Sequence, residues 1–495
     1  MIEELFLALP MAIVVIGAFI LLLISHSKRF NLDRLNLIAV FFLALSLLVQ
    51  YLDFDNNNVK FLFNDVFGDT FILDGFAKIF DIMFTVGAIL TLLINNDYFK
   101  SRHYFNGEYF ALILFSVFGM MMLSHAHELV TAFIALEIAS LSVYALVGYH
   151  KSNRVSSEAM MKYMILGSMT GAFFILGTAL IYGTVGSTHL NDIALYVSSK
   201  DVSELTLLIV GASFISITIM FKIGAVPFHS WVVDVYHGAP YPITMFMAST
   251  FKIAIFAIAL RLYIVNFAQI NFFWSEMLQV ITILTLIGGS WLAISQTLVK
   301  RMLAGSSIVH SGYLLVGISS LGLGSEVAGS AVMFYLIAYF ISSVGSFGIL
   351  SFIASQSKVQ MSYEDFKGFA YRRPYMALAM SIFMLSLAGF PSTIGFLGKF
   401  YIFTSAIESG QILLAGLGIL TAFISVYYYF KLIAMMYFYE SDDDKKELPI
   451  DISTILIFTM ALMVIWGGIG TSLIPFIPGA DSFIDMAKQA ISSLK

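Results

Sequence analysis

Six lysines of this 495-residue chain lie inside long apolar runs, where water cannot solvate an ammonium group. A lysine at the centre of a lipid bilayer costs about 3 kcal/mol, so it is retained where it has a partner, water or a role in moving charge. Because burial disfavours the ammonium form, a lysine in such a place can gain and lose a proton. These lysines therefore predict proton-transfer chemistry. They are Lys78, Lys162, Lys222, Lys252, Lys399 and Lys431.

Acidic and imidazole side chains accompany these lysines. Glu137 lies nine residues into its run, near the bilayer centre, where a carboxylate that faces a lysine can stay charged. Glu158 precedes Lys162 by four residues, a helical spacing that suits an ion pair, although Lys162 and Lys78 are close enough to their helix starts for snorkelling to explain them. His125 and His127, near the end of a run, are expected to be ordinary interfacial residues.

The composition identifies the runs as membrane spans. Apolar residues make up 59% of the chain and charged residues only 12%, about half the charged fraction of a soluble domain. The runs show no alternation of period 2, so they predict an all-α polytopic membrane protein with about 14 transmembrane helices. They cover residues 5–25, 31–51, 71–95, 108–124, 128–148, 158–184, 204–224, 241–262, 276–296, 303–323, 328–354, 376–396, 411–438 and 450–474.

Other features of the composition exclude several kinds of site. The chain has no cysteine, so it cannot ligate an iron–sulfur cluster through thiolates or form a disulfide. Its net charge of −5 argues against nucleic acid as a partner. No nucleotide-binding glycine loop or metal-ligand spacing is present. The acidic start at Glu3 and Glu4, with no small-residue cleavage site after the first run, predicts a retained first helix.

Two segments are too long for a single crossing and contain helix breakers. Residues 204–238 would span about 50 Å as one helix, against a hydrocarbon core of about 30 Å. Pro227 predicts an interruption there, because proline removes a backbone donor and clashes with the preceding turn. Pro391 predicts a second interruption within residues 375–408. Discontinuous seventh and twelfth helices with Lys222 and Lys399 beside the breaks suggest ion sites, since unpaired backbone groups are tolerated where they line a hydrated cavity.

The breaks and lysines suggest an internal repeat. Lys222 and Lys399 are 177 residues apart, and Phe251-Lys252 is echoed 179 residues later by Phe430-Lys431. Both offsets advance by five helices, an odd number, so the second copy would be inverted in the membrane. We therefore expect four parts: an N-terminal three-helix segment (1–107), a first repeat of helices 4–8 (108–262), an inverted second repeat of helices 9–13 (263–438), and helix 14 with a tail (439–495).

The positive-inside rule gives an orientation. Connections after the odd-numbered runs hold fifteen Lys and Arg residues, whereas the opposite side, with both termini, holds five. This asymmetry predicts that both termini face the outside.

The sequence FKIGAVPFHSW at residues 221–231, continuing as DVYHGAP at 234–240, resembles the signature of the antiporter-like subunits of respiratory complex I, and the resemblance covers nearly the whole chain. Within that family the chain is most similar to the subunit N group of bacterial NADH-quinone oxidoreductase. Its length suits fourteen helices without the long lateral helix of subunit L, and Lys399 stands where subunit M is expected to carry a glutamate. Residues 306–313 and 389–399 also resemble their subunit N counterparts.

The resemblance implies a role for several residues. Glu137 and Lys222 would form the input half-channel pair, Lys252 and His310 would continue a central polar axis, and Lys399 would end it in the output half. Secondary candidates are Glu158, Lys162, His229 and Lys431.

The resemblance also implies a proton-translocating membrane subunit of NADH:quinone oxidoreductase, multi-pass in the bacterial inner membrane with both termini periplasmic. Quinone, flavin and iron–sulfur centres would belong to partner membrane and peripheral subunits, and this chain would bind no cofactor or metal. Two alternatives are a subunit of a multi-subunit sodium/proton antiporter and a non-conducting membrane scaffold. The identity of the neighbouring genes would distinguish complex I from the antiporter. The paired helix breaks and lysines argue against the scaffold.

Overall fold

The computed structural model describes residues 8–26, 30–52, 61–62, 68–356, 361–440, 451–469 and 479–494, and every structural statement below concerns those residues. Each of the fourteen apolar runs contains a helix. Lys358 and residues 441–450 lie outside the described residues. The helices that follow the runs are α2 (Leu9–Ser25), α3 (Leu32–Leu52), α4 (Gly75–Ile94), α6 (Gly107–His125), α7 (Leu129–Val147), α8 (Arg154–Val185), α10 (Thr206–Ile223), α12 (Tyr241–Phe246) with α13 (Lys252–Arg261), α14 (Asn271–Ser295), α15 (Val299–Gly322), α16 (Ala328–Gln356), α18 (Pro374–Ala388), α20 (Ile412–Phe438) and α21 (Ile452–Ile469).

Shorter elements connect or extend these helices. They are α5 (Asn96–Ser101), α9 (Leu190–Ser199), α11 (Val232–Gly238), α17 (Phe369–Arg372), α19 (Ile394–Glu408), α22 (Ala480–Leu494), and a two-stranded antiparallel ladder of β1 (Phe61–Leu62) and β2 (Ile72–Leu73). Two π-helical turns, η3 (Met247–Phe251) and η4 (Leu262–Asn266), flank α13.

Twelve helices of the described chain are long and apolar enough to cross a membrane, and α2 and α18 are shorter apolar helices. The chain is therefore a helical polytopic membrane protein. The number of fourteen crossings and the inverted repeat stay predictions.

Both predicted helix breaks are present. Helix α10 ends at Ile223 with Gly224 in the left-handed region (φ 73°), and α11 begins only at Val232, after the cis peptide bond before Pro227. Helix α18 ends at Ala388 with Gly389 at φ 85°. Helix α19 then begins after Thr393, whose side chain caps it by accepting from the Phe396 amide. Glycine suits both ends because it adopts a positive φ without a side-chain clash.

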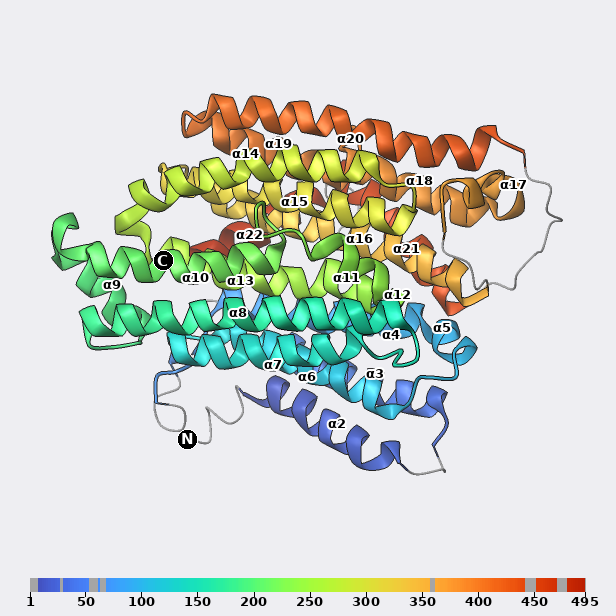
Figure 1. The fold of residues 1–495 in the computed structure, drawn as a ribbon, viewed down its shortest axis with the longest axis horizontal. Coiled ribbons are helices and arrows are strands. Elements are labelled where there is room, and N and C mark those ends of the chain that lie inside the picture. The colour runs from blue at the N-terminus through green and yellow to red at the C-terminus, as the bar shows by residue number, and fades with distance from the viewer. Residues whose placement is uncertain are drawn as a thin grey trace.

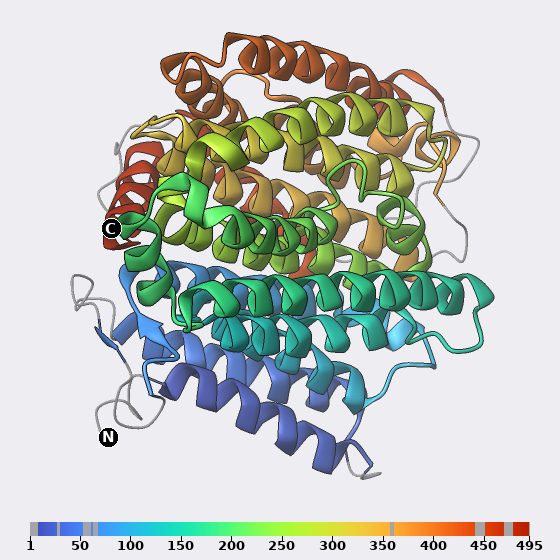
Figure 2. The same ribbon diagram turned by 60° about the vertical axis from the view of Figure 1, so that its left-hand side comes forward.

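The long helices lie side by side along one direction (Figures 1 and 2). In Figure 1 the N-terminal helices α2 and α3 lie at the lower edge and α20 at the upper edge, and α5 and α17 lie at the opposite end of the bundle from α9. The connections near α5 and α17 are those for which the sequence predicts the excess of basic residues. The bundle thus has a basic end and an opposite end.

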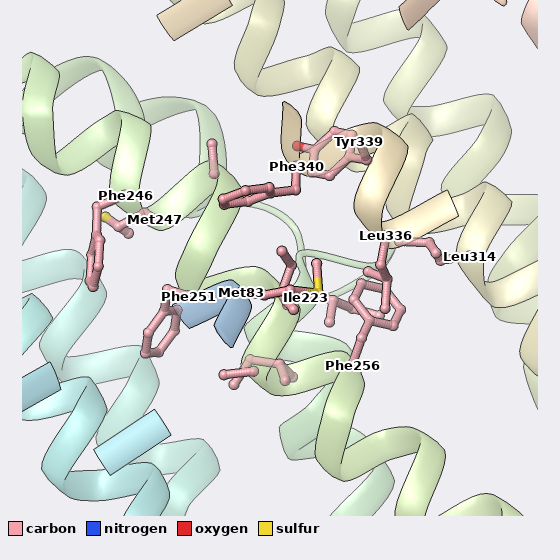
Figure 3. Close-up of a cluster of buried hydrophobic side chains, with 14 of the residues drawn as sticks. Met83, Ile223, Phe246, Met247, Phe251, Phe256, Leu314, Leu336, Tyr339 and Phe340 are labelled. Carbon is pink, nitrogen blue, oxygen red and sulfur yellow. The ribbon is translucent and has the colours of Figure 1, made fainter. Parts of the chain in front are cut away.

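Apolar side chains from five helices meet at the centre of the bundle (Figure 3). They include Met83 of α4, Ile223 of α10, Phe256 of α13, Leu314 of α15 and Leu336 of α16, all buried. Tyr339 lies at the edge of this cluster. The polar groups described next are therefore embedded in an apolar surrounding, which excludes water and strengthens each of their hydrogen bonds.

Candidate functional site

Lys222 lies in the last turn of α10, one residue before the break, and is buried. Its Nζ lies 2.8 Å from both Ser140 Oγ and Tyr144 OH of α7. The ammonium also lies over the Tyr144 ring, at 5.1 Å from its centroid. Because both partners are hydroxyls, which donate as well as accept, the same contacts can be kept by a protonated or a neutral amine.

Glu137 lies one helical turn before Ser140 on α7 and is half-buried. Its carboxylate does not form an ion pair with Lys222 within 4.0 Å; its Oε1 is buried and has no hydrogen-bond partner among the described residues. The predicted pair of Glu137 and Lys222 is thus not a direct ion pair in this structure: Lys222 bonds Ser140, one turn further along α7, and Glu137 packs against Gly171 of α8.

Lys252 begins α13 directly after the π-helical turn η3, an arrangement frequent at functional sites. Its buried Nζ donates to the Ser307 carbonyl at 2.8 Å and contacts Ser307 Oγ at 2.5 Å and Ser311 Oγ at 3.0 Å, all on α15. The Ser311 hydroxyl also donates to the Ile223 carbonyl at 2.8 Å. Ser311 therefore joins the broken end of α10, beside Lys222, to Lys252.

His310 continues the same polar row on α15. Its Nδ1 lies 2.6 Å from Tyr335 OH of α16, and its Nε2 lies 3.0 Å from Tyr429 OH of α20. Tyr429 also bonds Ser306. The imidazole is buried between two hydroxyls, so either tautomer can be accommodated by rotating their protons.

Lys399 lies in α19 and reaches back across the second break. Its buried Nζ donates to the carbonyls of Leu387 and Ala388, at 2.7 and 2.9 Å, which end α18. These carbonyls form the negative end of the α18 dipole. The ammonium also lies 4.8 Å from the centroid of Tyr313, a ring that contacts His310 edge-on. Lys222, Lys252, His310 and Lys399 thus occur in this order along one row of side-chain contacts, and Glu137 lies next to the Lys222 end, one turn from Ser140.

The secondary candidates lie outside this row. Lys162 pairs with Glu158 at 2.9 Å, as the spacing predicts, and with Asp234 of α11 at 3.0 Å. Arg301 binds the other oxygen of Asp234 at 3.3 Å, so this partly exposed network ties α8, α11 and α15 together. His229 is half-buried within the first break, and Lys431 lies 4.4 Å from the centroid of Tyr363.

A second buried charged cluster was not predicted. Arg261, one of the five basic residues that the sequence count places on the outer side, ends α13 and binds Asp74 through two bonds of 2.9 and 3.2 Å. His125, expected at the interface, is buried and lies 2.8 Å from Asp81. The spacing of Asp74 and Asp81 on one helix could have signalled two buried acids, but their partners come from distant helices.

Lys300 was also missed. The sequence places it in a basic connection, yet it is buried at the start of α15, with Nζ 2.6 Å from the Ala239 carbonyl. Among the described residues, no group of three His, Asp or Glu side chains could hold a metal ion.

The family profile and the related proteins that match this chain point to the same family. The profile of the family described as NADH:quinone oxidoreductase/Mrp antiporter, TM, matches residues 126–425. NADH-quinone oxidoreductase subunit N of Trichlorobacter lovleyi is 41% identical over 74% of this chain and 75% of its own length. The subunit N of Thioalkalivibrio sulfidiphilus is 32% identical over 97% of this chain and 98% of its own length.

Solved structures share the fold. A chain of respiratory complex I from Thermus thermophilus with bound aureothin superposes with a TM-score of 0.77 at 27% identity, covering 93% of this chain and 96% of that chain. A chain of the Mrp complex from Dietzia has a TM-score of 0.86 at 19% identity, covering 100% of this chain and 98% of that chain, a likeness of fold alone.

Proposed function

This chain belongs to the NADH:quinone oxidoreductase/Mrp antiporter family, within the subunit N relatives of respiratory complex I. We propose that its buried residues from Glu137 to Lys399 carry protons while the assembled complex reduces quinone. The chain is a membrane subunit of a proton-pumping NADH:quinone oxidoreductase. The redox chemistry belongs to its partner subunits, which supply the quinone, flavin and iron–sulfur centres.

The observation that supports this role is the set of partners around the three lysines. Lys222, Lys252 and Lys399 contact hydroxyl and carbonyl oxygens and take no part in the ion pairs of the described residues. An ion pair would hold a buried lysine charged, since neutralising it would strand its partner. Neutral oxygens accept hydrogen bonds from an ammonium or an amine alike, so each lysine can change protonation while its contacts persist.

The contacts suggest the order of transfer. Glu137 and Lys222 sit beside the first break, Ser311 links that break to Lys252, and the hydroxyls of Tyr335 and Tyr429 hold His310. Hydroxyl groups can relay a proton by accepting one and donating another. A charge arriving at one lysine repels a proton on the next, which couples successive transfers. Lys399, at the second break, is the output residue in this proposal.

The chain spans a membrane, and we infer that this is the bacterial inner membrane with both termini on the periplasmic side. The positive-inside count supports that orientation. The partners are the other membrane and peripheral subunits of complex I, the lipid bilayer and the translocated protons.

The test is Lys222→Ala in the intact complex, with proton pumping measured in reconstituted vesicles and normalised to assembled complex. The matched control is Lys200→Ala, because Lys200 is exposed and paired with Glu204 at 3.0 Å. Lys222→Ala should lose most pumping per electron while Lys200→Ala pumps normally. Wild-type pumping by Lys222→Ala would overturn the proton-carrier role.

The fold shared with the Mrp complex leaves sodium/proton antiport as the second candidate. It predicts sodium-dependent transport by a complex that lacks quinone reductase subunits. Identification of the subunits that co-purify with this chain separates the two.

A further inference from the structure

Lys300 and Arg301 are adjacent at the start of α15 but have opposite environments. Arg301 is partly exposed and binds Gln296 and Asp234. Lys300 is only 4% exposed, although a lysine in the first turn of a helix could reach water. Its Nζ bonds the carbonyl of Ala239 at 2.6 Å and that of His237 at 3.3 Å, and lies 4.1 Å from the Tyr241 centroid.

Lys300 therefore resembles the lysines of the polar row. Like Lys399, it donates to carbonyls at the C-terminal end of a short helix, here α11, and it is absent from the ion pairs of the described residues. A lysine with only neutral partners can be deprotonated without stranding a buried carboxylate.

A cavity of about 210 Å³ adjoins Lys300. Its wall includes Arg102, His150 and Asn153, which lie in connections at the basic end of the bundle, together with Leu298 and the α11–α12 turn. A cavity needs only roughly 10–15 Å³ of such volume to hold one water, so this one has room for several, beside polar groups that can bind them.

His150 supplies a proton acceptor at this cavity. Its ring stacks on Tyr104 with centroids 4.1 Å apart, outside the membrane spans. Burial, and secondarily the charge of Arg102, lowers the pKa of His150 below its ordinary value. The shift favours the neutral imidazole, which can accept a hydrogen bond from water in the cavity.

Helix α15 connects Lys300 to the polar row. Ser307, which holds Lys252, follows Lys300 by seven residues, so the two lie on the same face of the helix about 10 Å apart along its axis. The Tyr236 side chain lies near the Ser307 hydroxyl, and the next residue, His237, offers its backbone carbonyl to Lys300. Ser307, the hydroxyl that contacts Lys252, is thus about one to two helical turns from the cavity that adjoins Lys300.

We propose that this cavity is a proton-uptake vestibule that loads Lys252 directly, with Lys300 as its protonatable residue, in addition to the input at Glu137 and Lys222. Lys300 takes a proton from vestibule water and becomes an ammonium. It then returns this proton to water, and the Ser307 hydroxyl, which contacts Lys252, accepts a proton as it donates its own to the Lys252 amine. The inference rests on the proposed proton-carrying function and adds a second inlet to it.

The first test compares Lys300→Met and Lys300→Arg with Arg301→Ala in the assembled complex. Both Lys300 variants should take up fewer protons per electron than the wild type, because methionine cannot bind a proton and arginine cannot release one, while the inlet at Glu137 and Lys222 still works. Arg301→Ala, which removes a neighbouring charge and an ion pair, should keep normal uptake. If Lys300→Arg pumps like the wild type, Lys300 is only a structural cap of α11.

The second test uses the absence of cysteine from this chain. Leu298→Cys lies on the cavity wall, and Ser152→Cys is exposed on the connection that contributes His150 and Asn153 but does not line the cavity. A thiol reagent attached to Leu298→Cys should lower uptake as the Lys300 variants do, reversibly on reduction, whereas labelled Ser152→Cys should pump normally. Treated wild-type complex corrects for cysteines of partner subunits.

The results separate this inference from the proposed function. Normal pumping by labelled Leu298→Cys and by Lys300→Met, with loss in Lys222→Ala, would overturn the vestibule alone. Normal pumping by Lys222→Ala would overturn the proton-carrier role itself.

Discussion

Buried cations in this chain fall into two classes according to what holds them. Lys222, Lys252 and Lys399 contact oxygens without net charge, whereas Arg261 binds the carboxylate of Asp74 through two bonds. Arginine remains charged at every accessible pH, so a carboxylate partner suits it. The first class can change protonation, and the second is a fixed clamp between α13 and α4.

The clamp yields a stability prediction. Arg261→Met should destabilise the subunit by about 3–5 kcal/mol, because it leaves the Asp74 carboxylate buried without its partner. The double variant Arg261→Met with Asp74→Asn should recover much of this loss, since asparagine carries no charge and can still cap α4, as Asp74 does through the Ala77 amide. The measurement is the yield and thermal stability of assembled complex. Equal losses in the single and double variants would show that burial of charge is not the cause.

Sequence reasoning found the lysines of the first class because lysine in an apolar run is unusual. It missed Lys300, Arg261 and His125 because each lies near the end of a run, where local sequence also allows exposure. Their burial depends on segments distant in the chain, such as Asp74 for Arg261 and Ala239 for Lys300. These contacts between distant segments cannot be predicted from the local sequence pattern.

At the scale of elements, the two breaks were predictable because they rest on local chemistry. Pro227 and Pro391 cannot continue a helix, and glycines at 224 and 389 supply the positive φ that ends each first half. The π-helical turns beside Lys252 and Arg261 were not predictable, since their residues would also suit an ordinary α-helix. Helix α22 was also missed because its sequence is too polar to form an apolar run, yet it packs on α4 and α16.

The second break can be tested with two glycines of matched backbone. Gly389 and Gly410 both have positive φ, 85° and 78°, so alanine at either costs about 1–2 kcal/mol. A Cβ at Gly389 would lie 2.9 Å from Lys399 Cδ, whereas one at Gly410 meets nothing within 4 Å. Gly389→Ala should therefore lower pumping per electron more than Gly410→Ala, because it alone displaces the lysine. Equal pumping in the two variants would show that the geometry of the second break does not affect proton transfer by Lys399.

At the scale of the whole molecule, the bundle has two ends that face different compartments. Ser152 lies in the connection between α7 and α8 at the basic end, and Ser198 lies near the end of α9 at the other; both are exposed. An impermeant thiol reagent should label Ser152→Cys only in inverted vesicles and Ser198→Cys only in intact spheroplasts. The reverse pattern would place the termini in the cytoplasm and the vestibule on the wrong side for uptake.

The most direct measurement of the central claim is pumping per electron by Lys399→Arg, in vesicles normalised to assembled complex. Arginine can keep the charge and the bonds to the α18 carbonyls, but it cannot release its proton. If the lysines carry protons, Lys399→Arg should assemble normally and pump far less than the wild type. If the chain is a non-conducting scaffold, Lys399→Arg should have almost no effect on pumping per electron. Wild-type pumping by Lys399→Arg would contradict the proton-carrier role of this lysine.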